Sequence, residues 1–303
     1  GEDTLSLHDA LPISPVQARN TYRAGRLPTQ PVAPSGVLAR DFELECAEGH
    51  SLPVREYRPA GRDTMARLGA LVFFHGGGWV VGDRDTHDVL CRMLCHHGGI
   101  AVYNVDYRLA PEYRFPAAFD DACAAVRAVV DRADELLIDP LRLAVGGDSA
   151  GGTLAAVCAI HARDVGLKLA LQLLIYPGTA ARQETTSHNT YQSGFMLDKA
   201  TVDWFFDHYI DAKDRDDWRF APMLAERHDG LAPAWIGLAE CDPLVDEGVA
   251  YADMLRMAGV KVDLEIYHGV VHGFVNMGRV IPEARQAHQD AGRALKHAFA
   301  LGQ

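Results

Sequence analysis

The 303-residue chain has no long apolar run, no cluster of basic residues and no cysteine framework. Its longest apolar stretches, at residues 70–74 and 169–176, have the length of a strand, whereas a membrane span needs about 20 residues. Lys and Arg number 29 against 41 Asp and Glu, a net charge of −12, and no basic run is present that would follow a phosphate backbone. We therefore expect neither a membrane nor a nucleic acid as a partner.

The six cysteines are scattered, and most lie in apolar periodic segments, where a free thiol packs as a small hydrophobe. This usage predicts a reducing, cytoplasmic location. Cys91 and Cys95, with the adjacent His96 and His97, are residue types that bind metals. The histidines do not converge with both cysteines on one face of a helix. We therefore predict a half-buried helix there and no metal site.

The first 13 residues differ in character from the rest. Residues 2–13 resemble translated sequencing-adapter sequence, and the alternative is a poorly ordered native terminus. We expect residues 1–13 to be a non-native or disordered leader. Ser14 followed by Pro15 predicts a helix that begins immediately after them, with Ser14 as its N-cap.

From residue 41 onward, short apolar runs alternate with amphipathic helical segments, which predicts a mostly parallel sheet of about eight strands with helices on both faces. The expected strands are 41–46, 51–59, 69–75, 100–107, 141–148, 168–177, 234–240 and 262–268. The expected helices are 86–97, 116–130, 150–163, 244–258 and 282–301. The alternation breaks at 178–220, which is polar apart from an aromatic patch at 202–210.

This break predicts the domain organisation. We expect a catalytic core in two parts, 41–177 and 221–303, with cap segments at 14–40 and 178–220. The cap would lie over the carboxyl ends of the strands, where ligands bind in such sheets. Trp204, Phe205, Phe206 and Tyr209 fall within it and would either pack the cap or form a wall of the substrate pocket.

The strongest signal for chemistry is the G-x-S-x-G sequence at 147–151, between an apolar strand and a helix. A sharp strand-to-helix turn lifts the hydroxyl of Ser149 above the sheet and leaves room for little bulk beside it. A second signal is HGGGW at 75–79, directly after a buried strand. Its successive glycines can bring backbone N–H groups against a developing oxyanion, and His75 is expected to orient this loop by hydrogen bonding.

A nucleophilic serine needs a base and an orienting acid. Asp242 and His272 each follow a later predicted strand, in the chain order that this kind of sheet requires. The rivals are Asp246 and Glu247 for the acid and His268 for the base. The first two should lie on the next helix and the third at the end of a strand.

The chain resembles the hormone-sensitive lipase-like, or bacterial family IV, carboxylesterases of the α/β-hydrolase superfamily. The resemblance runs in order from about residue 41 to the end. It departs from the family pattern at Tyr113 and Arg114, where the family usually has His-Pro. The matching motifs are HGGGW (75–79), DYRLAPE (106–112), FPAA (115–118), GDSAGG (147–152), YPG (176–178), AECDPLVDEG (239–248) and HGF (272–274).

The resemblance implies an α/β-hydrolase fold with a small helical cap. It further implies Ser149 as nucleophile, Asp242 as orienting acid and His272 as base. The oxyanion donors would be the amides of Gly77, Gly78 and Ala150, with His75, Gly76, Trp79 and Asp148 as supporting or pocket residues. DYRLAPE is interpreted as structural.

The expected activity is that of a serine carboxylesterase acting on short- to medium-chain acyl esters through an acyl-enzyme, with no metal or organic cofactor. The alternatives are an amidase or arylformamidase on the same residues, and a non-catalytic ligand receptor of the same fold. Such receptors lack the catalytic histidine, which is present here as His272. The expected partner is a small-molecule ester, and assembly as a homodimer is left open.

Overall fold

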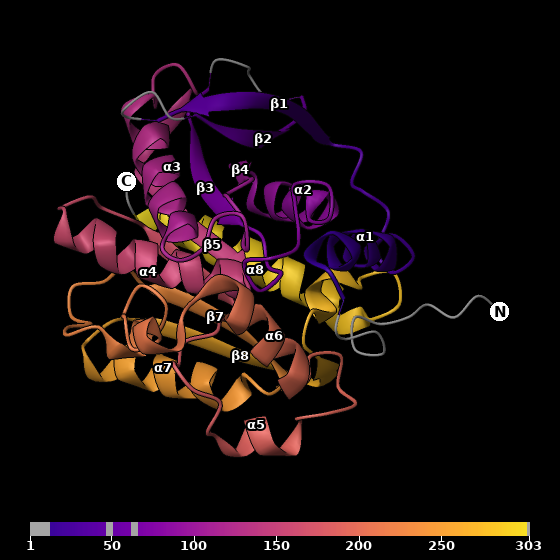
Figure 1. The fold of residues 1–303 in the computed structure, drawn as a ribbon. Helices are drawn as coiled ribbons and strands as arrows, with labels where there is room; N and C mark the ends of the chain where they lie inside the picture. The colour runs from indigo at the N-terminus through magenta and orange to yellow at the C-terminus, as the bar shows by residue number, and fades with distance from the viewer. Residues whose placement is uncertain (1–12, 47–50, 62–65, 302–303) are drawn as a thin grey trace.

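An eight-stranded, mostly parallel sheet forms the centre of the molecule (Figure 1). The computed structural model describes residues 13–46, 51–61 and 66–301. The strand order is β1-β2-β4-β3-β5-β6-β7-β8; β2 is antiparallel to β1 and β4, and the pairs from β4 to β8 are parallel. The predicted sheet is confirmed. Its strands are β1 (Val37–Glu45), β2 (Ser51–Pro59), β3 (Leu68–Phe74), β4 (Ala101–Val105), β5 (Ile138–Asp148), β6 (Leu171–Ile175), β7 (Ala234–Cys241) and β8 (Val262–Val271).

Helices cover both faces of this sheet. On one face α2 (Asp88–Gly98) packs against the C-terminal α8 (Pro282–Leu301), and on the other α3 (Ala117–Asp131) packs against α4 (Ala150–Asp164). A further helix, α7 (Val245–Met257), follows β7 and packs on β7 and β8. Parallel strands need such crossover helices, and these leave the central strands buried on both sides.

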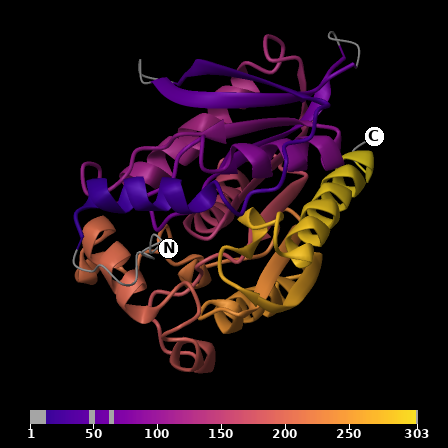
Figure 2. The same ribbon diagram turned by 90° about the vertical axis from the view of Figure 1, so that its right-hand side faces the viewer.

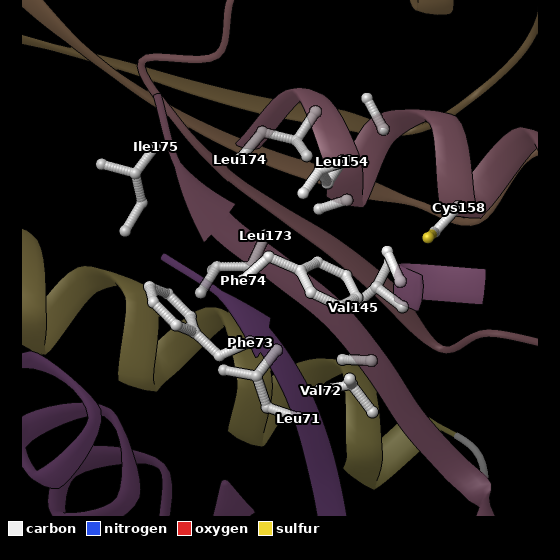
Figure 3. Packing of buried hydrophobic residues seen from close by; sticks show 14 of the residues in the cluster. Leu71, Val72, Phe73, Phe74, Val145, Leu154, Cys158, Leu173, Leu174 and Ile175 are labelled. Atoms are coloured by element: carbon white, nitrogen blue, oxygen red, sulfur yellow. The ribbon is translucent and has the colours of Figure 1, made fainter. Parts of the chain in front are cut away.

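The pleat of β3 shows how the core fills both layers. All seven residues of β3 are buried, and successive side chains point to opposite faces. Phe74 lies on the side of Leu154 from α4, whereas Phe73 points to the side of α8 (Figure 3). A Cβ on Gly69, on that second side, would lie 2.5 Å from the Phe299 ring. The central strand is therefore clamped between α4 and α8.

An N-terminal helix, α1 (Pro15–Arg26), is joined to the loops above the sheet. Ser14 and Gln17 form a capping box at its start, as the Ser-Pro sequence predicts. Arg19 donates hydrogen bonds to the carbonyls of Val80 and Ala110 and to the carboxylate of Glu112. The DYRLAPE motif thus serves as an anchor for α1, in keeping with its structural interpretation.

Two cap helices, α5 (Thr186–Thr190) and α6 (Lys199–Tyr209), lie in the segment where the alternation breaks. α6 lies at the same end of the sheet as α1 (Figure 2). Arg114 donates to the carbonyl of Asp207 and to the carboxylate of Asp211, so the departure from the family pattern at this position joins the core to α6. The sequence did not predict α5, which has only five residues and a Thr185 cap.

The leader predicted at residues 1–13 lies outside the described residues except for Ile13, which is half-buried against the core. Residues 47–50, between the first two predicted strands, also lie outside them. Within the described ranges, none of the helices combines the length and the apolar character that crossing a bilayer requires.

Candidate active site

Ser149 occupies a sharp turn between β5 and α4. Its backbone has φ 55° and ψ −123°, a conformation that costs a non-glycine residue of the order of 1–3 kcal/mol. The flanking glycines are required by close approach. A Cβ on Gly147 would lie 2.3 Å from the backbone of Gly151, and one on Gly151 would lie 1.9 Å from the Phe74 carbonyl oxygen. The turn therefore raises the Ser149 hydroxyl at the edge of the sheet, as the G-x-S-x-G sequence predicts.

Ser149, His272 and Asp242 form a hydrogen-bonded row across three loops. The Ser149 Oγ lies 2.9 Å from His272 Nε2, and His272 Nδ1 lies 2.6 Å from Asp242 Oδ2. Because Nδ1 faces a carboxylate it carries the proton, which leaves Nε2 free to accept one from the serine. Asp242 is fully buried, and its other oxygen accepts from the Leu244 amide at 2.9 Å.

The rival residues lie elsewhere. The His268 side chain is 81% exposed and its Nδ1 is 3.2 Å from Glu240, on the surface. Asp246 accepts from the Ser187 amide of the cap, and Glu247 accepts from the amides of Thr179 and Ala180. Of the acids and bases considered from the sequence, the structure therefore brings only Asp242 and His272 to Ser149.

The HGGGW loop borders the serine. Gly77 and Gly78 have φ values of +123° and +56°, and a Cβ on Gly77 would lie 2.1 Å from the Val81 carbonyl oxygen. Gly77, Gly78 and Ala150 all line the cavity next to Ser149. No described residue accepts a hydrogen bond from the amides of these three. Among the described residues these three backbone donors are therefore unused, as the oxyanion role expected from the sequence requires.

Beneath this loop lies a buried polar network. The His75 Nδ1 faces the Gly76 carbonyl at 2.9 Å, and its ring stacks on Tyr107 at 4.4 Å. Burial, together with the neighbouring His87, lowers the pKa of His75. Asp148 accepts from the Gly76 amide at 2.9 Å and faces His87 Nε2 at 3.2 Å.

His87 is the member of this network that sequence reasoning missed. It is fully buried, and no motif marks it. Burial alone would raise the pKa of Asp148, but His87, with smaller contributions from Arg26 and the Gly76 amide, lowers it to about 2. Through these contacts Asp148 joins the turn carrying Ser149 to the HGGGW loop.

A cavity of about 370 Å³ opens above Ser149. Trp79 lines it and stacks on Tyr209 of α6 at 4.5 Å. Of the four cap aromatics, Phe205 and Phe206 line the cavity, whereas Trp204 and Tyr209 are not among its lining residues. Two of these aromatics thus form part of the pocket wall, and the other two pack within the cap. Other lining residues include Thr21, Tyr22, Arg26, Met196, Leu197, Val202, Phe220 and Leu244.

This combination of features defines the class of α/β hydrolases: a serine in a strand-turn-helix junction, a His–Asp pair hydrogen-bonded to it, and a glycine loop beside it, all on a mostly parallel sheet. Comparisons with known proteins agree. Residues 71–276 match the family described as alpha/beta hydrolase fold. The chain is 47% identical over 247 residues to an ethyl acetate hydrolase of Pseudomonas putida, covering 80% of this chain and 78% of that one.

A second relative, the carboxylesterase NlhH of Mycobacterium tuberculosis, is 44% identical over 254 residues, covering 82% of this chain and 79% of that one. The crystal structure of a thermostable esterase from Pseudomonas putida ECU1011 is 37% identical, with a TM-score of 0.90 and coverage of 95% of this chain and 91% of that one. The chain belongs to the hormone-sensitive lipase-like carboxylesterases of the α/β-hydrolase superfamily.

Proposed function

We propose that the chain is a serine carboxylesterase in which Ser149 is the nucleophile, His272 the general base and Asp242 the orienting acid. The observation that carries this assignment is the hydrogen-bonded row of 2.9 and 2.6 Å that joins the three side chains. The relatives named as carboxylesterase and ethyl acetate hydrolase support the reaction class.

The reaction follows from this row. Ser149 Oγ attacks the ester carbonyl while its proton passes to His272 Nε2, and the carbonyl oxygen becomes an oxyanion on the amides of Gly77, Gly78 and Ala150. His272 then gives the proton to the departing alcohol oxygen, which leaves an acyl-enzyme. A water molecule, deprotonated by His272, releases the acid in the same way. Asp242 stabilises the imidazolium that forms in each half-reaction.

The cap sets the substrate range. The segments 14–40 and 178–220 supply cavity residues from both sides, including Tyr22, Phe205 and Phe206. The cavity volume of about 370 Å³ lies near the lower end of the roughly 300–1,000 Å³ found for small-molecule sites. We therefore propose a preference for short- to medium-chain acyl groups.

We also propose a cytoplasmic location, which the six free thiols support.

A series of p-nitrophenyl esters from acetate to palmitate tests this proposal. We expect kcat/KM to rise over the first members and to fall steeply for long chains, because each methylene gains about 0.8 kcal/mol only while the cavity buries it. No increase in rate is expected when the substrate forms an emulsion. Faster hydrolysis of emulsified long-chain triglyceride than of soluble butyrate would show a true lipase instead.

Replacing Asp242 with asparagine should lower kcat about 10⁴-fold, because an amide stabilises the wrong imidazole tautomer of His272. Asp246→Asn is the matched control, since Asp246 is four residues away and its carboxylate accepts from the cap amide of Ser187. We expect that variant to retain most of its activity. Steady-state hydrolysis of p-nitrophenyl butyrate measures both, and equal losses would contradict the assignment of Asp242.

A further inference from the structure

Arg26, the last residue of α1, places a positive charge on the wall of the cavity. Its Nη1 donates to the carbonyl of Gly273 at 3.4 Å, and Gly273 directly follows His272. Its Nη2 donates to the Tyr22 hydroxyl, and the guanidinium carbon lies 4.5 Å from the Tyr22 ring centroid. The cation is thus positioned beside the loop that carries the catalytic base.

The other charged groups of the cavity wall are already engaged. Asp148 is held by Gly76 and His87, and Glu247 by two amides, with His188 Nε2 3.3 Å from its second oxygen. Arg182 is paired with Asp216 at 3.1 Å.

Arg26 differs from these groups in having no carboxylate partner among the residues that the structure describes. It forms an ion pair with none of the described residues. Arg26 contributes to the lowered pKa of Asp148, but the Asp148 carboxylate makes its hydrogen-bond contacts with Gly76 and His87.

The guanidinium also has hydrogen-bonding capacity left over. It offers five N–H donors in a planar fork, and the described residues accept from only its two Nη atoms. The Nε has no acceptor among the described residues and is not among the fully buried atoms without a partner, so this donor is open to the cavity or to solvent. A carboxylate is the planar, charged acceptor that such a fork binds best.

We propose that Arg26 forms a subsite for a carboxylate on the substrate, so that the enzyme hydrolyses esters carrying a second, free carboxylate, such as half-esters of dicarboxylic acids. This inference rests on the proposed esterase function and deepens it. The half-ester is neutralised at Arg26 while its ester carbonyl lies at Ser149. The net charge of −12 repels anions at long range. The attraction of Arg26 for the substrate carboxylate therefore acts only within the cavity.

Two pairs of esters, matched in carbon skeleton, test the proposal by pH-stat titration. Monoethyl glutarate against ethyl pentanoate places the carboxylate on the acyl side, and 3-(butanoyloxy)propanoate against propyl butanoate places it on the alcohol side. In the unmodified enzyme, kcat/KM for the charged member of at least one pair should equal or exceed that of its neutral partner. In Arg26→Gln the charged-to-neutral ratio for that pair should fall tenfold or more, as expected for the loss of a charge-assisted contact.

Arg23→Gln is the matched control. Arg23 lies on the same helix, its side chain is 57% exposed and it pairs with Asp83, so this variant removes the same charge without touching the cavity and should leave the ratio unchanged. Arg26→Lys, which keeps the charge but not the fork, should lower the ratio by an intermediate factor and serves if Arg26→Gln fails to fold.

The outcomes are separable. Strong discrimination against the charged ester in both pairs by the unmodified enzyme, or a ratio that moves less than twofold in the Arg26 variants, would overturn the subsite. A fall of the same size in Arg23→Gln would assign the effect to overall charge and overturn it as well. Failure of the unmodified enzyme to hydrolyse ethyl pentanoate and propyl butanoate would instead contradict the proposed esterase function.

Discussion

Ser149→Ala should lower kcat for p-nitrophenyl butyrate hydrolysis about 10⁶-fold, the scale seen when a triad nucleophile is removed. The variant has no oxygen at the position that faces His272 Nε2 at 2.9 Å, so no acyl-enzyme forms. The residual rate would come from the oxyanion amides and substrate binding alone. Labelling by a fluorophosphonate probe, which reacts only with an activated serine, should disappear together with the activity.

Ser193→Ala provides the control for this experiment, because Ser193 is an exposed cap serine. That variant should retain both the label and the rate. A label that persists on Ser149→Ala, or that maps to another serine, would show that the nucleophile is wrongly assigned. Circular dichroism of each variant establishes that the comparison is made on folded protein.

His272→Ala should lower kcat by a factor of similar size, because the members of a triad act as a unit and the loss of one removes most of the effect of all. Without the imidazole, the Ser149 proton has no acceptor, and the buried carboxylate of Asp242 keeps only the Leu244 amide of the two partners described above. The second loss is structural, so we also expect a lower melting temperature.

The matched control is His268→Ala, four residues earlier in the chain. This histidine is 81% exposed and contacts Glu240, so its removal should leave most of the activity. Rates for the two alanine variants, measured on one substrate, decide between the histidines. Equal losses in both would mean that proximity in the structure has failed to identify the base.

The sequence predicted much of this site because its motifs coincide with backbone necessity. Only glycine tolerates the 1.9 Å approach at Gly151, and only a loop after a later strand brings Asp242 and His272 to the same edge of the sheet as Ser149. Strand positions were predicted well because buried parallel strands require continuous apolar runs. β8 extends to Val271 rather than ending at 268, since its pairing with β7 resumes after an irregularity at Cys241.

The features that sequence reasoning missed depend on contacts between distant residues. His87 lies 61 positions from Asp148, and Arg26 lies 247 positions from Gly273. Contacts between residues so far apart in the chain produce no pattern in the sequence from which they could be predicted. The short α5 was missed because five residues span little more than one turn. The domain boundaries and the roles of the site residues remain predictions, which the variants above test.

The positive φ of Ser149 has a consequence for the evolution of the protein. Glycine is relieved of the backbone penalty that serine suffers there, so Ser149→Gly removes this strain together with the nucleophile. At this position natural selection has favoured reactivity over stability, which is the trade-off expected of a functional residue. A screen for thermostable variants that measures folding alone would therefore not protect the nucleophile.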